Sequence, residues 1–423
     1  MSTVEQSRAT SEAEAAASLL RSTHAVRERC GQLLKRARNG ESRWFTVEDG
    51  FLATAAREVA DITKKRYPRL HVPLHSRWRH LEAGGVNRKA ELDRLMEHLP
   101  RQTRLHALVD FTFVSVLLDG GAGADWSYTE AATGKTFTRS EGLAVASFHA
   151  FTSGLFSSDK RHPFQADAAG LRGLSTDHLA SAFQVRENNP LIGLENRAIL
   201  LRRLGEEMGE QPEVFNEDGR PSGLFDLILT PFGSTVPPRT AEESAHDILS
   251  EILLTCSGIW PQGNTIGNMA LGDCWRHEAV RGEGASDGWV PFHKLSQWLT
   301  YSLLEPFSWA GVRVHGVDAL TGLAEYRNGG LLIDTAVLRL RDESVTQHVW
   351  QPGDELIVEW RALTVALLDE LAVEVRKLLH TDADHLSMAA VLEGGTWAAG
   401  RELAQRHRGG LPPLQVASDG TVF

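Results

Sequence analysis

The sequence predicts a mainly α-helical protein with minor β structure, built as one large domain. Three observations lead to this prediction. Apolar residues recur at helical spacing in long stretches, strand-like alternation is scarce, and no Pro- or Ser-rich linker divides the chain. We expect a polar segment and helix over residues 1–39 and a single helical domain over residues 40–423.

The expected helices follow from the spacing of their apolar residues. One start is marked by Thr240, whose hydroxyl precedes Glu243 by three residues, the spacing of a capping box. Glycine stretches such as Gly120–Gly123 and Gly329–Gly330 predict tight turns between helices. The helical pattern covers Ala13–Arg38, Thr46–Lys65, Asn87–Leu99, Leu105–Leu118, Ser140–Leu155, Gly193–Glu210, Glu242–Ser257 and Leu356–Leu379.

Composition excludes several classes of protein. The 423 residues include 55 acidic and 44 basic side chains, a net charge of −11, which disfavours binding to nucleic acid. The three cysteines show no spacing typical of a disulfide framework or a thiolate zinc site, which fits a reducing cytoplasm. The long apolar run from Leu105 is interrupted by Asp110 and Asp119, so we expect a soluble protein without membrane spans.

The segment Leu320–Leu338 brings four chemically active side chains together between apolar residues. Glu325, Tyr326, Arg327 and Asn328 are consecutive. A carboxylate can stabilise positive charge on a sugar ring or deprotonate water, and Arg327 can fix an anion or orient the carboxylate. Spacing alone favours a different interpretation, a surface helix end with Glu325 and Arg327 solvated and the two glycines as its stop.

A second candidate region, Leu117–Phe148, combines carboxylates with aromatic residues. A glycine turn after a buried helix presents these side chains, and an aromatic ring there can stack on a flat amide-bearing group. The alternative is a helix corner in which Trp126 belongs to the core and Ser140 only caps the next helix. The candidate residues are Asp119, Asp125, Trp126, Tyr128 and Glu141.

A third candidate region is the basic stretch Lys64–His80, which stands out in an acidic protein. Arg77 and Arg79 can bind phosphate oxygens through their guanidinium groups, with His75 or His80 assisting. The alternative interpretation is a solvated basic face.

The fourth candidate region, Trp260–Val280, concentrates polar side chains in a stretch typical of a loop. Asp273 and His277 are four residues apart, so with His293 they can form a metal site of two histidines and a carboxylate. The spacing matches no strong metal motif, and our first expectation is a site without metal. The candidate substrate-binding residues are Trp260, Gln262, Asp273, Trp275 and His277.

Motifs of other chemistries are missing from the sequence. Isolated serines such as Ser257 beside Gly258 do not indicate a catalytic nucleophile, and the cysteines show no pairing with histidine typical of one. A Walker loop and a Gly-x-Gly-x-x-Gly turn after a strand are also absent. We therefore expect no nucleotide cofactor, and no other cofactor is implied.

Taken together, these segments resemble a family of uncharacterised proteins from the uracil catabolic pathway of fungi and bacteria that proceeds without reduction and has ribosylurea as an intermediate. The resemblance extends over nearly the whole chain after residue 40. It is carried by Val72–His80, Ser115–Tyr128, Arg139–Phe148, Asn189–Gly205, Trp260–Asn264, Gly272–His277 and Leu320–Asp334.

The segment Leu320–Leu338 is also distantly similar to the aspartate-tyrosine-arginine segment of queuosine salvage N-glycosylases. Their acidic-hydrophobic-Arg-Ala helix has its counterpart in the segment from Ile357, with Glu359 and Arg361. This resemblance implies a helical fold like that of DNA glycosylases, with the acid of the segment at the ribose. Glu325 replaces the aspartate and is one methylene longer. Glu359 and Arg361 are implied to lie beneath the site.

The two resemblances imply an N-ribosyl hydrolase that cleaves the C–N bond of ribosylurea or its 5′-phosphate without metal. Glu325 is implied as the carboxylate at the anomeric carbon, with Asp119 or Asp125 as the second acid. Tyr326 and the other candidates would contact a small ribosylated substrate, and Arg77, Arg79 and Arg327 are the phosphate candidates. Two alternatives remain open at this stage, namely a metal-dependent amidohydrolase acting on a ureido intermediate and a noncatalytic binding subunit. The oligomeric state is not predicted.

Overall fold

The computed structural model describes residues 3–229, 242–261 and 263–421, and the described chain is mainly α-helical, as predicted. The described strands are short and form two-stranded pairs. The chain divides into two compact units, each assembled from three stretches. Unit 1 comprises residues 1–75, 263–297 and 316–417, and unit 2 comprises residues 76–262, 298–315 and 418–423. A single domain beginning at residue 40 stays a prediction.

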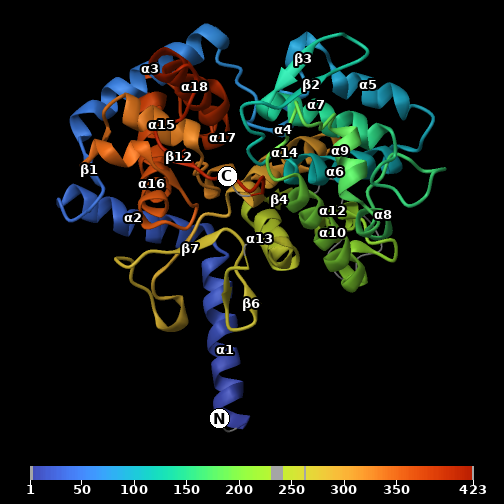
Figure 1. The fold of residues 1–423 in the computed structure, drawn as a ribbon, viewed down its shortest axis with the longest axis horizontal. Helices are drawn as coiled ribbons and strands as arrows, with labels where there is room; N and C mark the ends of the chain where they lie inside the picture. Colours follow the sequence, from blue (N-terminus) through green and yellow to red (C-terminus); the bar gives the residue numbers. More distant parts are fainter. Residues whose placement is uncertain (1–2, 230–241, 262, 422–423) are drawn as a thin grey trace. The chain divides into compact units, whose positions relative to one another are not determined.

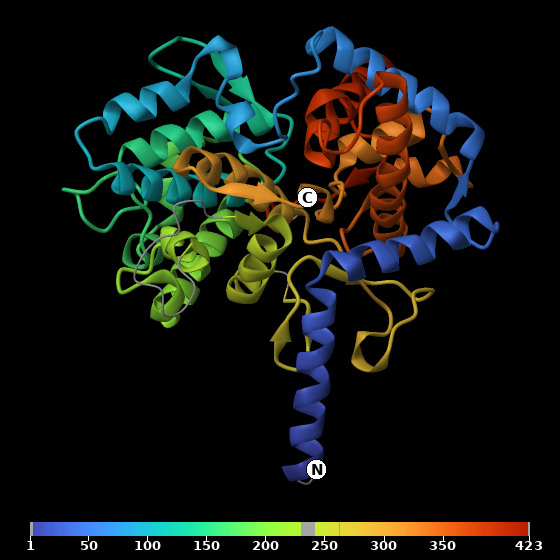
Figure 2. The same ribbon diagram turned by 180° about the vertical axis from the view of Figure 1, so that it is seen from behind.

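Helix α16 (Glu355–Leu379) is the central helix of unit 1. Its sequence is apolar almost all round, which is typical of a buried helix, and Leu356–Val365 is buried without interruption. Helices α2 (Thr23–Arg38), α3 (Leu52–Arg66) and α15 (Tyr326–Asp334) pack against it (Figures 1 and 2). One buried core cluster of unit 1 consists of Val26, Cys30, Leu33, Val280, Val290, Phe292, Ala324, Val358, Ala362 and Val365.

The remaining elements of unit 1 surround this core. Its other helices are α1 (Thr3–Leu20), α17 (Met388–Val391), a π-helical turn (Leu392–Thr396) and α18 (Trp397–Arg408). Its strands pair as β1 (Phe45–Val47) with β10 (Leu338–Leu340), β5 (Thr265–Ile266) with β6 (Met269–Ala270), β7 (Cys274–Arg276) with β8 (Trp289–Pro291), and β11 (Val349–Trp350) with β12 (Gln415–Val416). Only the last of these four pairs is parallel.

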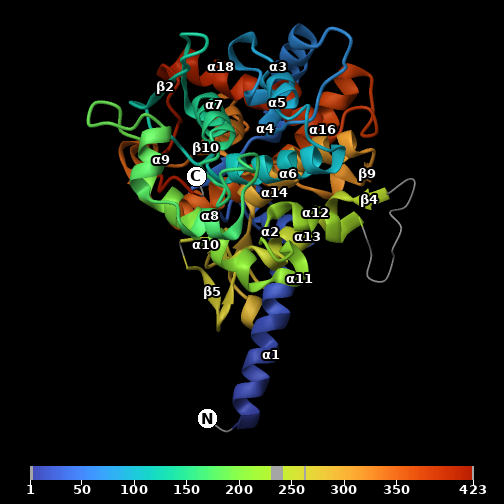
Figure 3. The same ribbon diagram turned by 90° about the vertical axis from the view of Figure 1, so that its right-hand side faces the viewer.

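Unit 2 is built around α6 (Arg101–Leu117), which is buried from Ala107 to Leu117. Helices α7 (Arg139–Thr152), α10 (Leu194–Glu210) and α12 (Pro221–Leu229) pack against α6 (Figure 3). The other helices are α4 (Arg77–His80), α5 (Arg88–Leu95), α8 (Ala168–Arg172), α9 (Thr176–Ala182), α11 (Pro212–Phe215) and α13 (Ala245–Thr255). The strand pairs are β2 (Ser127–Thr129) with β3 (Thr136–Thr138), antiparallel, and β4 (Glu242–Ser244) with β9 (Arg313–His315), parallel.

Helix α14 (Lys294–Ala310) belongs to both units, because the boundary between them falls after Gln297. None of the described helices combines the length and the apolarity that a bilayer-spanning helix needs.

The structure corrects three of the predicted helices. The predicted helix Ala13–Arg38 is two helices, because Ser22 ends the first and caps the second by accepting a hydrogen bond from Ala25 N at 3.1 Å. The predictions starting at Thr46 and Glu242 extended too far towards the N-terminus, because both starts lie in paired strands. Thr240, the expected capping residue, lies outside the described residues.

Candidate functional site

The predicted site residues divide between the two units, and we describe each unit by itself. Gln262 lies outside the described residues. Unit 1 contains His75, Asp273, Trp275, His277, Glu325, Tyr326 and Arg327. Unit 2 contains Arg77, Arg79, Asp119, Asp125, Trp126, Tyr128, Glu141 and Trp260.

Glu325 is the N-cap residue of α15. Its backbone is extended, and its carboxylate accepts hydrogen bonds from the backbone N–H groups of Arg327 at 3.1 Å and Asn328 at 2.9 Å. These two bonds fix the orientation of the carboxylate, which keeps further lone pairs for other partners. Burial raises the pKa of Glu325, while Lys294 and the two backbone N–H groups oppose that rise.

The surface helix end that spacing alone favoured is therefore wrong. Helix α15 begins at this segment, runs through Gly329 and Gly330, and ends at Asp334. The glycines permit close packing instead of stopping the helix. A Cβ atom on Gly329 would lie 2.7 Å from the indole of Trp360 in α16, and one on Gly400 of α18 would lie 2.1 Å from the carbonyl oxygen of Arg327.

Arg327 is a buried cation whose side chain is only 3% exposed. Its guanidinium carbon lies 4.9 Å from the ring centre of Tyr326 and 5.8 Å from that of Trp397. Within the described part of the chain, Nε and Nη1 of Arg327 have no hydrogen-bond partner, and neither has Oδ1 of the neighbouring Asn328. Buried polar groups without partners are costly, so such a group in a folded protein indicates a place for a ligand or an ordered water.

Asp273 and Arg361 form a buried ion pair that supports this segment. The guanidinium donates two hydrogen bonds to the carboxylate, at 2.8 and 2.7 Å, and its Nε lies 3.4 Å from the carbonyl oxygen of Ala324, the residue before Glu325. Trp275 Nε1 and Lys294 N donate two more hydrogen bonds to Asp273. Burial alone would raise the pKa of Asp273, but Arg361 and the other donors lower it to about 2. The side chains of Asp273 and Trp275 therefore make their hydrogen bonds within the protein. Through Arg361, which contacts the carbonyl of Ala324, they support the backbone that precedes Glu325.

His277 is hydrogen-bonded to Glu359 on the same central helix. Its Nδ1 accepts from Ala279 N at 3.1 Å, so the proton is on Nε2, which donates to Glu359 at 3.1 Å. Ser42 donates its hydroxyl proton to the other oxygen of Glu359. These contacts are internal to the core.

The three residues considered for a metal site have separate partners. Asp273 pairs with Arg361, His277 with Glu359, and Nε2 of His293 lies 2.9 Å from the carbonyl oxygen of Leu20. Over residues 3–229, 242–261 and 263–421, no group of three or more His, Cys, Asp or Glu side chains is arranged to hold a metal ion.

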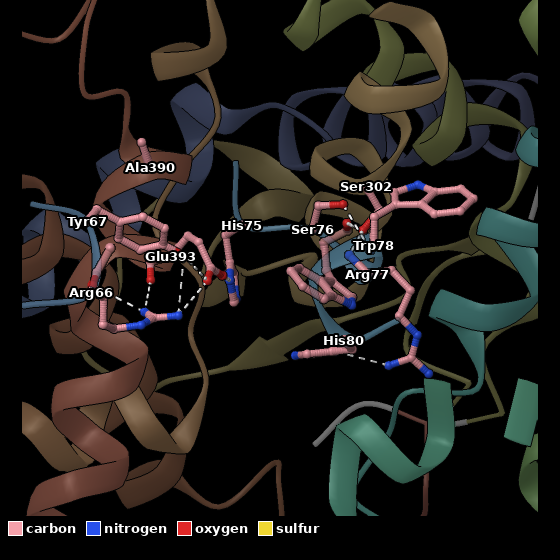
Figure 4. A network of polar contacts seen from close by, with 12 residues as sticks. Arg66, Tyr67, His75, Ser76, Arg77, Trp78, His80, Ser302, Ala390 and Glu393 are labelled. Carbon is pink, nitrogen blue, oxygen red and sulfur yellow. Dashed lines mark hydrogen bonds and ion pairs between the residues drawn. The ribbon is translucent and has the colours of Figure 1, made fainter. Parts of the chain in front are cut away.

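Sequence reasoning did not identify a second buried carboxylate in unit 1, Glu393, which lies in the π-helical turn. Figure 4 shows Arg66, Tyr67 and His75 pointing towards it. Arg66 Nη2 lies 2.8 Å from its carboxylate, the Tyr67 hydroxyl 3.1 Å and His75 Nδ1 3.0 Å. Burial would raise the pKa of Glu393, but His75 and Arg66 lower it to about 2. In the sequence, this site could have been noticed only from the glycine pair Gly394–Gly395 next to Glu393. The pair lies in the π-helical turn, and such turns often occur at functional sites.

In unit 2, Arg77 and Asp119 form a buried ion pair at 2.7 Å. Arg77 also donates to the Ser115 hydroxyl at 2.8 Å and to the Ser140 carbonyl at 3.1 Å, and its Nη1 lies 3.3 Å from His80 Nδ1 (Figure 4). Three elements of unit 2 therefore meet at one guanidinium.

Arg79 is also paired with carboxylates of its own unit. Its guanidinium lies 2.5 Å from Glu82 and 2.7 Å from Glu305. Its charge is thus largely compensated within the protein.

The aromatic candidates of unit 2 are packing residues. Trp126 is 1% exposed, its Nε1 donates to the Phe183 carbonyl at 3.0 Å, and its ring stacks on Phe183. Trp126 therefore belongs to the core of a helix corner, as the alternative interpretation expects, instead of forming the wall of a pocket. Tyr128 is buried and stacks on His149 at 6.1 Å.

The remaining candidates of unit 2 differ in their exposure. Asp125 is exposed, and Glu141 is half-buried in the first turn of α7. Trp260 is buried, and its carbonyl accepts a hydrogen bond from Arg203 at 2.9 Å.

The fold and the site in unit 1 define a mainly helical protein with a capped, partly buried carboxylate beside a buried guanidinium. The chain belongs to the DUF1688 family, described as proteins of unknown function, whose family model matches residues 19–423.

Two named relatives are similar over most of their length. The chain is 38% identical to Protein urg3 of Schizosaccharomyces pombe over 406 residues, which is 94% of this chain and 96% of that protein. It is also 38% identical to Uracil catabolism protein 4 of Lachancea kluyveri over 382 residues, 83% of this chain and 85% of that protein. The family membership expected from the sequence is thereby confirmed.

Proposed function

We propose that this protein is an N-ribosyl hydrolase of uracil catabolism, which cleaves the ribosidic C–N bond of ribosylurea or its 5′-phosphate. The observation that carries the proposal is the carboxylate of Glu325, which is fixed by two backbone N–H groups and lies beside a buried guanidinium. The name of the Lachancea kluyveri relative supports the pathway. The resemblance of the segment around Glu325 to N-glycosylases supports the type of reaction.

In the proposed reaction the bond between the anomeric carbon and the urea nitrogen breaks, and the electron pair leaves with the nitrogen. The ribosyl cation that develops is stabilised by the carboxylate of Glu325, which also accepts a proton from the attacking water. The products are ribose, or its phosphate, and urea. The departing nitrogen takes up one proton, so the reaction consumes one water molecule and no other reactant.

The same carboxylate needs a raised pKa and a fixed position to act in this way. A general base is most effective when its pKa is close to the working pH, and burial moves the pKa of Glu325 in that direction. The ion pair of Asp273 and Arg361 beneath Ala324 keeps the segment in place. Asp119 and Asp125 remain proposals for the second acid, with Asp119 held by Arg77 and Asp125 open to solvent.

The test is a release assay with purified, chelator-treated protein. Ribosylurea and its 5′-phosphate are supplied separately, and free urea and ribose are measured. We expect turnover without added metal, and a loss of at least about 100-fold in kcat for Glu325→Gln, the range of a missing acid–base group. The matched control is Glu402→Gln, which removes an exposed carboxylate from α18 and should leave kcat unchanged.

Any one of three results would overturn the proposal. Undiminished turnover in Glu325→Gln would remove Glu325 from the reaction. Tight binding of ribosylurea without any release of urea would favour the noncatalytic binding subunit, and turnover restored only by metal would favour the amidohydrolase.

A further inference from the structure

We infer that Arg327 is the anion-binding residue of this site, and that the substrate carries a phosphate monoester on its ribose. This inference rests on the proposed function, because it concerns the substrate of the same site. It starts from a comparison of the three arginines that the sequence nominates for phosphate binding, namely Arg77, Arg79 and Arg327.

Two of these arginines are already neutralised by carboxylates. Arg77 pairs with Asp119, and Arg79 pairs with Glu82 and Glu305. Each of them keeps one buried nitrogen without an acceptor in the described part of the chain, Nη2 of Arg77 and Nε of Arg79. Arg327 differs because two of its nitrogens, Nε and Nη1, lack an acceptor there and no carboxylate among the described residues is ion-paired with its guanidinium. The carboxylate of Glu325 accepts a hydrogen bond from the backbone N–H of Arg327, not from its guanidinium.

The environment of Arg327 keeps the charge in place while leaving its N–H donors available. The ring faces of Tyr326 and Trp397 attract the cation without consuming hydrogen-bond donors. Both rings are half-buried. A guanidinium held in this way is suited to a planar or tetrahedral oxyanion, which accepts two N–H groups at once.

The chemistry of the proposed substrate restricts what this anion can be. Urea and ribose are neutral, and ribosylurea has no carboxylate. The anionic group that a ribosylated urea can carry is therefore a phosphate ester of a ribose hydroxyl. Upstream of this enzyme, the pathway must then supply a ribosyl phosphate, and the product to be consumed downstream is a sugar phosphate.

Binding of the product tests the inference without requiring catalysis. Ribose 5-phosphate, ribose and inorganic phosphate are titrated into wild type, Arg327→Gln, Arg327→Lys and Arg406→Gln by calorimetry. The last variant removes the same charge from an exposed position on the same helix that carries Trp397. We expect ribose 5-phosphate to bind wild type and Arg406→Gln more tightly than ribose. In Arg327→Gln its affinity should fall by about 10- to 100-fold, and in Arg327→Lys by less, because lysine keeps the charge but not the bidentate geometry.

A thermal readout separates loss of binding from loss of folding. Removing an unpaired buried charge should not destabilise the free protein, so Arg327→Gln should melt no lower than wild type. Ribose 5-phosphate should raise the melting temperature of wild type and of Arg406→Gln, but not that of Arg327→Gln. Equal affinity for ribose 5-phosphate in wild type and Arg327→Gln would overturn the inference. So would turnover of ribosylurea as efficient as that of its 5′-phosphate, a result that would leave the proposed function intact. If binding depended on the phosphate and on Arg327 but no substrate were turned over, the anion-binding role of Arg327 would stand and the proposed hydrolase function would fail.

Discussion

At the scale of single residues, the buried charges around α15 differ in how completely they are paired. Asp273 receives hydrogen bonds from Arg361, Trp275 and Lys294, so its negative charge is fully compensated inside the protein. Arg327 has ring faces around it but no acceptor among the described residues. A buried charge that is fully paired, such as Asp273, fixes the positions of its neighbours. A buried charge without an acceptor, such as Arg327, can still bind an anion.

The ion pair between Asp273 and Arg361 should contribute strongly to stability. Arg361→Met leaves the buried carboxylate without its partner, which costs about 3–5 kcal/mol in the free energy of unfolding. The measurement is urea denaturation at neutral pH. The double variant Asp273→Leu/Arg361→Met should recover part of the loss, because no unpaired charge remains.

An exposed pair provides the contrast for that experiment. Arg161 and Asp159 lie 2.9 Å apart on the surface, and Arg161→Met should leave the free energy of unfolding nearly unchanged, because solvent screens an exposed ion pair. A loss below about 1 kcal/mol in Arg361→Met would contradict the role that we assign to the buried pair.

A sequence can predict which side chains lie together where neighbours in the chain are neighbours in space. Glu325, Tyr326 and Arg327 are consecutive, so their proximity follows from their order. The pairing of Asp273 with Arg361 spans 88 positions and that of His75 with Glu393 spans 318. Nothing in local spacing indicates such partners, and for this reason Asp273, Trp275 and His277 were predicted as substrate contacts.

At the scale of elements, α15 is positioned by glycines in two helices. Gly329 lets α15 approach Trp360 of α16, and Gly400 lets α18 approach the backbone of Arg327. We expect Gly400→Ala to force the two helices apart, because its Cβ would meet a backbone oxygen that has no freedom to move away. The cost should be about 1–3 kcal/mol in the free energy of unfolding, together with weaker binding of ribose 5-phosphate.

Gly31→Ala is the matched control for this substitution. Gly31 lies inside α2, and a Cβ there would meet nothing within 4 Å. Since alanine favours the helix over glycine, this variant should be more stable than wild type by up to about 1 kcal/mol and should bind normally. Chemical denaturation and calorimetry measure both effects. If Gly400→Ala and Gly31→Ala had the same stability and the same affinity for ribose 5-phosphate, Gly400 would not be required for the packing of α15.

The elements that sequence predicted best are those whose burial follows a simple period. Helices α6, α10 and α16 agree with prediction to within a few residues because their apolar residues recur over many turns. Helix α15 is short and contains two glycines, which in isolation indicate a turn. The paired strands are two or three residues long, so they are too short to show an alternating pattern of apolar and polar residues in the sequence.

At the scale of the whole molecule, each unit is assembled from stretches that are distant in sequence. Composition and periodicity could predict the mainly helical class, because both are properties of the chain as a whole. They could not predict which stretches join which unit, since that depends on contacts between side chains hundreds of positions apart. The division therefore becomes visible only in three dimensions.

The two units should differ in their response to acid. A carboxyl group whose pKa is lower in the folded protein stabilises the fold above its unfolded pKa, and this contribution is lost as the pH falls to the folded value. A raised pKa has the opposite sign, because the folded protein then holds the proton more tightly. Unit 1 contains Asp273 and Glu393, each with a pKa lowered to about 2, and Glu325, whose pKa burial raises. In unit 2 Glu130 is lowered to about 2, but burial raises the pKa of Asp110 and Glu305.

We therefore expect unit 1 to lose its structure at a higher pH than unit 2 on acidification from pH 5 towards pH 2. The protein is incubated at a series of acidic pH values and pulse-labelled by hydrogen exchange, and labelling is compared between peptides of α16 and α6. Helix α16 should lose protection first. In Glu393→Gln the group no longer titrates, so the acid sensitivity of α16 should decrease while that of α6 stays the same. Simultaneous loss of protection in both helices, or earlier loss in α6, would mean that these buried carboxylates do not determine the acid stability of the fold.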